Sequence, residues 1–178
     1  KPNFKERLVA ITGPGGGSGK MGICMIQLYH DYKAKNFSKY AKYETFPIWN
    51  LPLTHPVNLA YEAATADLGD YNMIDPYYKK KTGEESVNYN RDVENFEILK
   101  ELLTRLDPEE SAWVTSPTEM GINMDSEGFV DEEKIKNAAE TEILARYKEY
   151  QSEFQKGVES EQTVKRAEEI MKKAGLAS

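Results

Sequence analysis

A glycine-rich segment near the start of the chain has the residue types and spacing of a phosphate-binding loop. Five glycines fall within residues 13–19, and a lysine follows directly. Because glycine has no Cβ atom, consecutive residues can adopt positive φ and point their backbone N–H groups into one concavity, which suits an anion. The residues that we predict to bind the phosphate are Gly13, Gly15, Gly16, Gly17, Ser18, Gly19 and Lys20.

Elements on both sides of this loop must position it. An apolar run at residues 8–12 predicts a buried strand before the loop. After the loop, apolar residues at helical spacing predict a helix over about fifteen residues that starts at Lys20. The unpaired N–H groups and the dipole at the start of this helix would face the same concavity. Strand, loop and helix in this order are the context that a phosphate-loop motif requires.

The loop matches the strict motif G-x-x-x-x-G-K-[ST] only in part. It ends on Gly19 and Lys20, but Pro14 stands at the first glycine position and Met21 stands at the Ser/Thr position. A thioether is a poor ligand for Mg²⁺, which prefers oxygen. Either Mg²⁺ is held by other residues, or the ligand needs no metal.

A second motif fits the same segment. Gly17, Gly19 and Gly22 satisfy G-x-G-x-x-G, and Glu44 follows about twenty residues later, where a dinucleotide-binding fold places the acid that binds the ribose. This alternative leaves residues 13–18 as a longer turn than a dinucleotide site needs. A third interpretation is a glycine turn that binds no ligand.

Three carboxylates compete for the role of a general base or a metal ligand. Glu44 lies near the end of a strand predicted at residues 43–46, and Glu119 follows one predicted at 112–115, so both would lie at the carboxyl edge of the sheet, where open α/β sheets bind ligands. Asp75 ends a short apolar stretch and is the candidate metal ligand. The plain alternatives are a solvent-facing glutamate and turn residues next to prolines. The loop after the later strand adds polar groups that could bind the ligand: Ser116, Thr118 and Asn123.

The alternation of predicted strands and helices indicates a three-layer α/β fold. We expect a mainly parallel sheet, with the glycine loop after its first strand and a pair of helices at the C-terminus. From Asp131 apolar residues recur at helical spacing as far as Gly157, and Ser160 is the expected cap of a last helix. We predict a single domain over residues 1–178, with an α/β core at 1–130 and a helical layer at 131–178. An aromatic stripe on this layer could contact other domains: Tyr147, Tyr150 and Phe154.

Composition limits the classes of function. The formal net charge of the 178 residues is −7, and no cluster of Lys and Arg alternates with aromatic residues, so we do not expect nucleic-acid binding. No apolar run approaches the length of about 20 residues that a membrane span requires, so we expect no membrane partner. The single cysteine is typical of a reducing compartment, and we expect a cytoplasmic protein. The only two histidines, His30 and His55, cannot form an H-E-x-x-H zinc motif or a Cys/His metal cluster.

Five strings extend over nearly the whole chain: ITGPGGGSGKM, YETFPIWNLPLTHPVNLAYEAATADL, NMIDP, VNYNRDVE and SPTEMGIN. Together they resemble a bacterial family known as domain of unknown function family eighteen forty-six. The chain differs from the family's pattern at Gly16, where the family has proline, and at Glu119, where it has aspartate. The resemblance implies a bacterial origin and a central domain of a longer protein, with the flanking domains as partners. It implies no particular activity.

Three functions are compatible with these observations. The first is binding of a nucleotide or another small phosphorylated molecule, with phosphoryl transfer or nucleotide hydrolysis in which Lys20 neutralises charge and Glu44 or Glu119 acts as a base. The second is a dinucleotide-binding oxidoreductase domain that holds NAD or NADP through Glu44. The third is a non-enzymatic assembly domain of a larger protein, which could also form a homo-oligomer.

Overall fold

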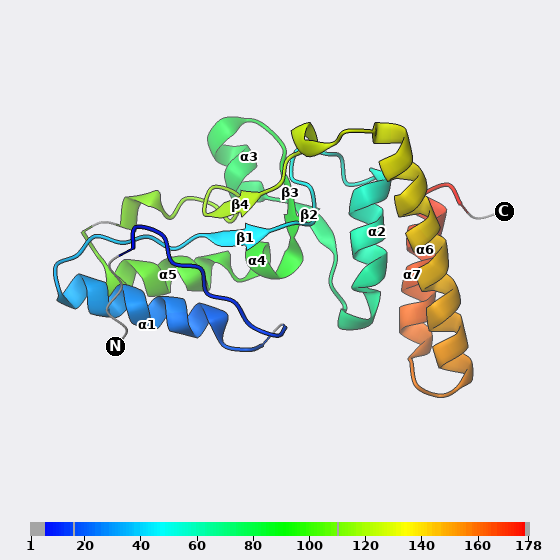
Figure 1. The fold of residues 1–178 in the computed structure, drawn as a ribbon, viewed down its shortest axis with the longest axis horizontal. Coiled ribbons are helices and arrows are strands. Elements are labelled where there is room, and N and C mark those ends of the chain that lie inside the picture. The colour runs from blue at the N-terminus through cyan, green and yellow to red at the C-terminus, as the bar shows by residue number, and fades with distance from the viewer. Residues whose placement is uncertain (1–5, 16, 110, 177–178) are drawn as a thin grey trace.

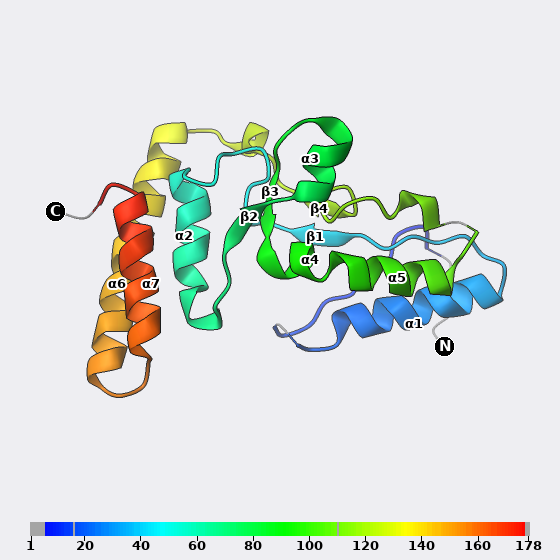
Figure 2. The same cartoon turned by 180° about the vertical axis from the view of Figure 1, so that it is seen from behind.

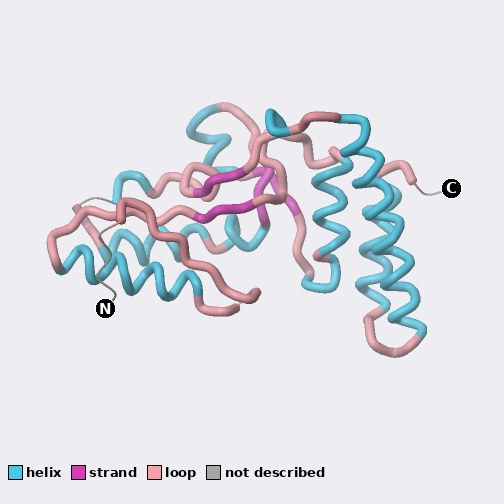
Figure 3. Tube along the Cα trace, viewed as in Figure 1, coloured by secondary structure: helices cyan, strands magenta, loops and turns pink. Residues whose placement is uncertain are grey.

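Two groups of helices lie on either side of four short strands (Figures 1 and 3). The computed structural model describes residues 6–15, 17–109 and 111–176. Within these ranges, no helix combines the length and the apolar character that a membrane span requires. The first group is built around α1 (Lys20–Lys33) and α5 (Phe96–Leu106), and the second consists of α2 (Pro56–Ala64), α6 (Glu132–Gln155) and α7 (Glu161–Lys173).

The strands form two separate pairs. β1 (Lys42–Glu44) runs parallel to β4 (Gly121–Asn123), and β2 (Asn72–Ile74) runs antiparallel to β3 (Val87–Tyr89). Each strand has three residues. The parallel pair brings residues about 80 positions apart side by side and thereby joins the two halves of the first helix group.

The first helix group is held together by a small apolar core. Its fully buried members come from α5 and from the segment that leads into β4, while α1 contributes only partly buried side chains. The short helix α4 (Asn90–Glu94) precedes α5 and continues directly from β3. The buried residues of this core, which we call the α5 cluster, are Phe96, Leu103, Val114 and Met120.

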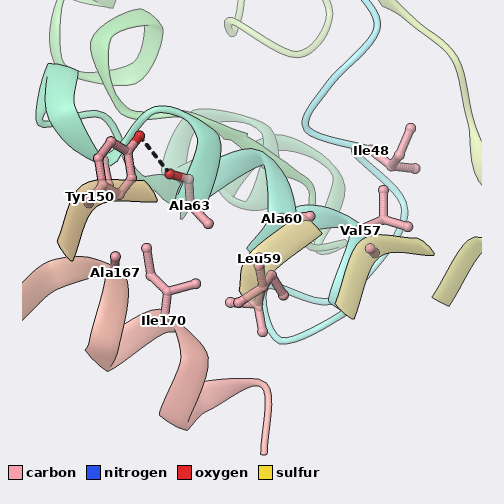
Figure 4. Packing of buried hydrophobic residues seen from close by; sticks show 11 residues of the cluster. Ile48, Val57, Leu59, Ala60, Ala63, Tyr150, Ala167 and Ile170 are labelled. Atoms are coloured by element: carbon pink, nitrogen blue, oxygen red, sulfur yellow. Dashed lines mark hydrogen bonds between the residues drawn. The ribbon is translucent and has the colours of Figure 1, made fainter. Parts of the chain in front are cut away.

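The second helix group is a three-helix bundle with its own core. The amphipathic face of α6 packs against α2 and α7, as Figures 1 and 2 show from opposite sides. Tyr150 is buried there, and its hydroxyl donates a hydrogen bond to the carbonyl oxygen of Ala63 at 3.1 Å (Figure 4). The Ser160 hydroxyl caps α7 by accepting a hydrogen bond from the Thr163 N–H. The C-terminal helix pair predicted from the sequence is confirmed. Tyr150, which we expected on a stripe that could contact other domains, is instead buried in the core of this bundle.

The predicted three-layer parallel sheet is not evident. Residues 8–12, expected as a buried first strand, form no strand, and Leu8 is 85% exposed. The strand expected at 112–115 is instead a 3₁₀ turn at Ser111–Trp113, and the strand on this side of the molecule is β4. Short apolar runs do not distinguish a strand from other buried segments by periodicity, and a strand also needs a neighbour with which to pair.

Candidate functional site

The glycine loop is exposed and precedes α1, as predicted. Gly17 and Gly19 have φ values of 73° and 86°, a conformation that favours glycine. The Lys20 ammonium bends back over the loop, where Nζ donates to the Gly15 carbonyl oxygen at 2.6 Å and to the Ser18 hydroxyl at 3.0 Å. The loop therefore holds its own cation above an exposed turn.

Two further glycines complete the description of the loop. A Cβ atom on Gly13 would lie 2.5 Å from the Ser18 Oγ atom, so only glycine fits at position 13 without displacing that side chain. The Ser18 hydroxyl in turn donates to the Gly15 carbonyl oxygen at 2.8 Å. Gly16, also predicted to bind phosphate, lies outside the described residues.

A shallow pocket brings the start of α1 next to the predicted acid Glu44. Met21, in the first turn of α1, lines this pocket together with a cluster of charged residues from β1 and α4. The Lys42 Nζ atom lies 2.6 Å from the Glu44 Oε1 atom and also pairs with the Asp92 carboxylate. The pocket, which we call the Glu44 pocket, is lined by Met21, Tyr40, Lys42, Glu44, Asp92, Phe96, Leu99, Pro117, Met120 and Gly121.

Partial burial shifts the proton affinities in the Glu44 pocket. Burial raises the pKa of Glu44; the Lys42 ammonium opposes this shift, and the Asp92 carboxylate adds to it. Burial alone would lower the pKa of Lys42, but the two carboxylates outweigh it and the pKa is raised. Burial, with Glu44 nearby, also raises the pKa of the Tyr61 phenol to about 12. The cluster therefore combines a firmly charged lysine with a carboxylate that holds a proton more tightly than usual.

The charged cluster continues along β3 through an aromatic side chain. The Lys42 Nζ atom lies 5.0 Å from the centre of the Tyr89 ring, a distance at which a cation is attracted to the ring face. The Tyr89 hydroxyl donates to the Asp70 Oδ2 atom at 2.6 Å, and the Arg91 Nη2 atom lies 2.7 Å from the Asp70 Oδ1 atom. Burial and the hydrogen bond to Asp70 raise the pKa of Tyr89. These contacts hold the wall of the pocket in place.

Asp75, the predicted metal ligand, caps the helix α3 (Pro76–Thr82). It is fully buried, and its Oδ1 atom accepts from the N–H groups of Tyr77 and Tyr78 at 2.9 and 3.1 Å. Its Oδ2 atom accepts from the N–H group and the hydroxyl of Thr118 at 3.0 and 2.8 Å. The described residues contain no group of three or more His, Cys, Asp or Glu side chains arranged to hold a metal ion. This geometry does not favour a metal role, which stays a prediction.

The polar residues predicted after the later strand serve the protein's own backbone. Ser116 is fully buried, and its hydroxyl accepts from the Glu119 N–H at 3.0 Å. The Asn123 side-chain amide donates to the carbonyl oxygens of Glu44 and Pro47 at 3.0 and 2.9 Å. Neither these residues nor Thr118 line the Glu44 pocket.

Glu119, the second predicted base, is held in a surface ion pair. Both of its carboxylate oxygens accept from the Lys81 Nζ atom, at 2.7 and 2.8 Å, and the Thr115 hydroxyl adds a further hydrogen bond. The hydrogen bonds from Lys81 and then Thr115 lower the pKa of Glu119. A carboxylate with a lowered pKa is a weaker base, so the geometry favours Glu44 over Glu119 for that role.

Sequence reasoning missed two members of the charged cluster, Lys42 and Asp92. A signal was present for the first, because side chains alternate along a strand and position 42 therefore shares a face with Glu44. Asp92 lies in the first turn of α4, a place typical of an acidic residue in any helix. Its approach to β1 depends on a contact across 50 sequence positions, which no local pattern reveals.

Together, the short-stranded α/β fold and the charged pocket beside a glycine loop define a mixed α/β domain with a candidate polar ligand site. The sequence model described as "Domain of unknown function DUF1846, N-terminal" matches residues 3–175, so the chain belongs to this family. The match is to the N-terminal part of the family, rather than to the central domain that we expected.

Curated relatives occur in Fusobacterium and Clostridium species. The UPF0371 protein of Fusobacterium nucleatum is 47% identical over 169 residues, which are 95% of this chain and 33% of that protein. The UPF0371 protein of Clostridium tetani is 47% identical over 169 residues, which are 95% of this chain and 34% of that protein. The chain thus spans about a third of the length of the curated relatives that it matches.

Proposed function

We propose that this chain binds a phosphorylated ligand that also carries hydroxyl groups, of the nucleotide class. One observation carries the proposal: Met21, in the first turn after the glycine loop, lines the same pocket as Glu44 and Asp92. A phosphate at the loop and a sugar in the Glu44 pocket would then be neighbours. Carboxylate oxygens accept hydrogen bonds from sugar hydroxyls, and helix N-termini bind phosphate.

The phosphate half of the proposal depends on the loop backbone and on Lys20. The partners of its Nζ atom, the Gly15 carbonyl oxygen and the Ser18 hydroxyl, are both exposed, so exchanging them for phosphate oxygens buries no unpaired group. Gly17 and Gly19 already hold the left-handed conformations that turn successive N–H groups toward one side. A change in the lysine side chain would expose this part of the loop to an anion.

The chemical half of the proposal depends on Glu44. Its raised pKa suits a group that takes a proton from water or from an acceptor hydroxyl as that oxygen attacks the terminal phosphorus, while the bridging P–O bond breaks and the rest of the ligand leaves through its phosphate oxygen. Lys20 and Lys42 would neutralise the charge that develops on the phosphoryl oxygens. Magnesium does not fit the donor set of this pocket, because Met21 replaces the usual hydroxyl ligand and a metal cluster is absent from the described residues.

A dinucleotide is the second candidate ligand. The placement of Glu44 beside the start of α1 favours it, because dinucleotide-binding folds put an acid at this place to bind the ribose. Both candidates share a phosphate at the loop and a ribose at Glu44. The two proposals predict different affinities: a dinucleotide site should bind NAD or NADP more tightly than ATP or GTP, and a mononucleotide site should do the reverse.

The test is thermal unfolding of the chain, and of a full-length relative, with ATP, GTP, NAD, NADP, sugar phosphates and inorganic phosphate. A ligand present at about a hundred times its Kd adds about 2.7 kcal/mol to the free energy of unfolding, which raises the Tm measurably. We expect Lys20→Gln to abolish the increase. The matched control is Lys33→Gln at the opposite end of α1, which should retain it. An unchanged response in Lys20→Gln contradicts the role of the loop, and no response to any ligand in either protein refutes the proposed function.

A further inference from the structure

The parallel pair of β1 and β4 is incomplete as a sheet. Tyr43 and Ile122 lie opposite each other in its register, and their side chains are 67% and 52% exposed. They occupy the face away from Lys42 and Glu44, because neighbouring side chains on a strand point to opposite faces. Parallel sheets occur almost only where both faces are covered, and two strands alone are marginally stable in water.

Apolar side chains around this pair are also uncovered. In α1, Ile23 and Ile26 are 51% and 61% exposed although they are spaced to lie on one side of the helix. In α5, Ile98 and Leu102 are likewise exposed and four residues apart. The apolar segment around Leu8 is exposed and forms no strand among the described residues. By contrast, the bundle of α2, α6 and α7 buries most of its large apolar side chains.

We propose that polypeptide from the rest of the family's longer chain completes this sheet and covers the face that carries Tyr43 and Ile122. The relatives contain enough additional polypeptide for this, because they are about three times as long as the matched region. An extended segment can add itself to a strand edge through main-chain hydrogen bonds while apolar side chains cover the exposed pair. The occupant is therefore an apolar β-forming segment of the same protein. The docking side is the first helix group with its sheet, instead of the aromatic stripe of α6.

The test is the rate at which introduced cysteines react with a maleimide, followed by mass spectrometry of the peptides. Tyr43→Cys and Ile122→Cys report on the proposed contact, and Val158→Cys, in an exposed apolar position after α6, is the matched control. In the full-length protein of the family that contains this chain, we expect positions 43 and 122 to react at least about ten-fold more slowly than position 158. In the 178-residue chain alone, all three positions should react at similar rates.

Two outcomes overturn the proposal. One is equal reaction at positions 43, 122 and 158 in the full-length protein, which would leave this face open to solvent. The other is protection of positions 43 and 122 in the chain alone that increases with its concentration, which would make a second copy the occupant. Hydrogen exchange of the unaltered protein provides a second measurement. In the full-length protein an added strand should slow the exchange of N–H groups along the outer edges of β1 and β4, and in the 178-residue chain alone this slowing should be absent.

Discussion

Replacement of Asp75 by alanine should destabilise the chain far more than the loss of an ordinary helix cap. Both carboxylate oxygens are buried and each accepts two hydrogen bonds, two from the first turn of α3 and two from Thr118. Asp75→Ala removes all four at once. The Thr118 N–H and hydroxyl lie in a buried environment, so water cannot easily replace the lost acceptor.

The size of the effect follows from these two losses. Loss of the cap costs about 1 kcal/mol. Leaving the donors of Thr118 unsatisfied costs about 1–3 kcal/mol for each group that finds no new partner. With both Thr118 donors unsatisfied, we therefore expect the free energy of unfolding to fall by about 3–7 kcal/mol. Asp75→Asn should cost less, about 1–3 kcal/mol, because the amide oxygen still accepts one pair of hydrogen bonds. The amide NH2 group then faces the donors of the other pair and cannot accept from them.

Urea unfolding at pH 7, followed by circular dichroism, measures this difference. The matched control is Asp131→Ala: Asp131 also caps a helix, α6, but its cap is exposed, and its carboxylate accepts from the Lys134 N–H and pairs with the Lys134 ammonium at the surface. That control should lose about 1 kcal/mol. If Asp75→Ala and Asp131→Ala lose the same amount, the buried network around Asp75 does not stabilise the fold as argued here. Asp75→Asn keeps the comparison possible if the alanine variant is unfolded.

Two further predictions concern the Glu44 pocket and its surroundings. Because folding raises the pKa of Glu44, the favourable contribution of this carboxyl group to the free energy of unfolding is present below its unfolded pKa and is lost as pH rises through its folded pKa. Glu44→Gln cannot ionise, so urea unfolding between about pH 4 and 8 should show the variant gaining stability relative to the unaltered chain as pH rises. A difference in stability that stays constant with pH would contradict this. Gly121→Ala should lower the free energy of unfolding by about 1–3 kcal/mol, measured by thermal unfolding, because the new Cβ would lie 2.3 Å from the Trp49 Cη2 atom. The control Gly22→Ala in α1 places its Cβ near no other atom and should be neutral or stabilising. Equal effects of the two substitutions would refute the clash.

The helices were the part of the fold that the sequence predicted well. Apolar residues repeat along α6 and α7 for many turns, and a serine at position 160 is a preferred N-cap residue. Local information was therefore sufficient to predict these helices. The helix that begins at Lys20 is predictable for the same reason, together with the glycine at its N-cap. The placement of Glu44 near that helix start could also be inferred from the order of the elements.

The strands and the charge pairs were not predictable in the same way. Strands of three residues contain too few positions to establish an alternating pattern, and the pairing of β1 with β4 joins segments that are about 80 positions apart. Glu119 was expected to be a base because its loop is polar, but its partner Lys81 comes from α3, 38 positions earlier. Asp75 was expected to bind metal because it follows apolar residues, yet the same position serves a helix cap. Long-range contacts decide between such roles.

The two separate apolar cores limit how far structural damage can spread. The bundle core around Ile143 and Ala167 and the α5 cluster share no buried residue within the described ranges. A cavity opened in one core thus removes contacts that the other does not use, and partial unfolding can stay within one cooperative unit. The loop and the Glu44 pocket belong to the α5 side. Substitutions could accumulate in the bundle over evolution while the pocket keeps its shape, so the two halves of this chain are free to diverge at different rates.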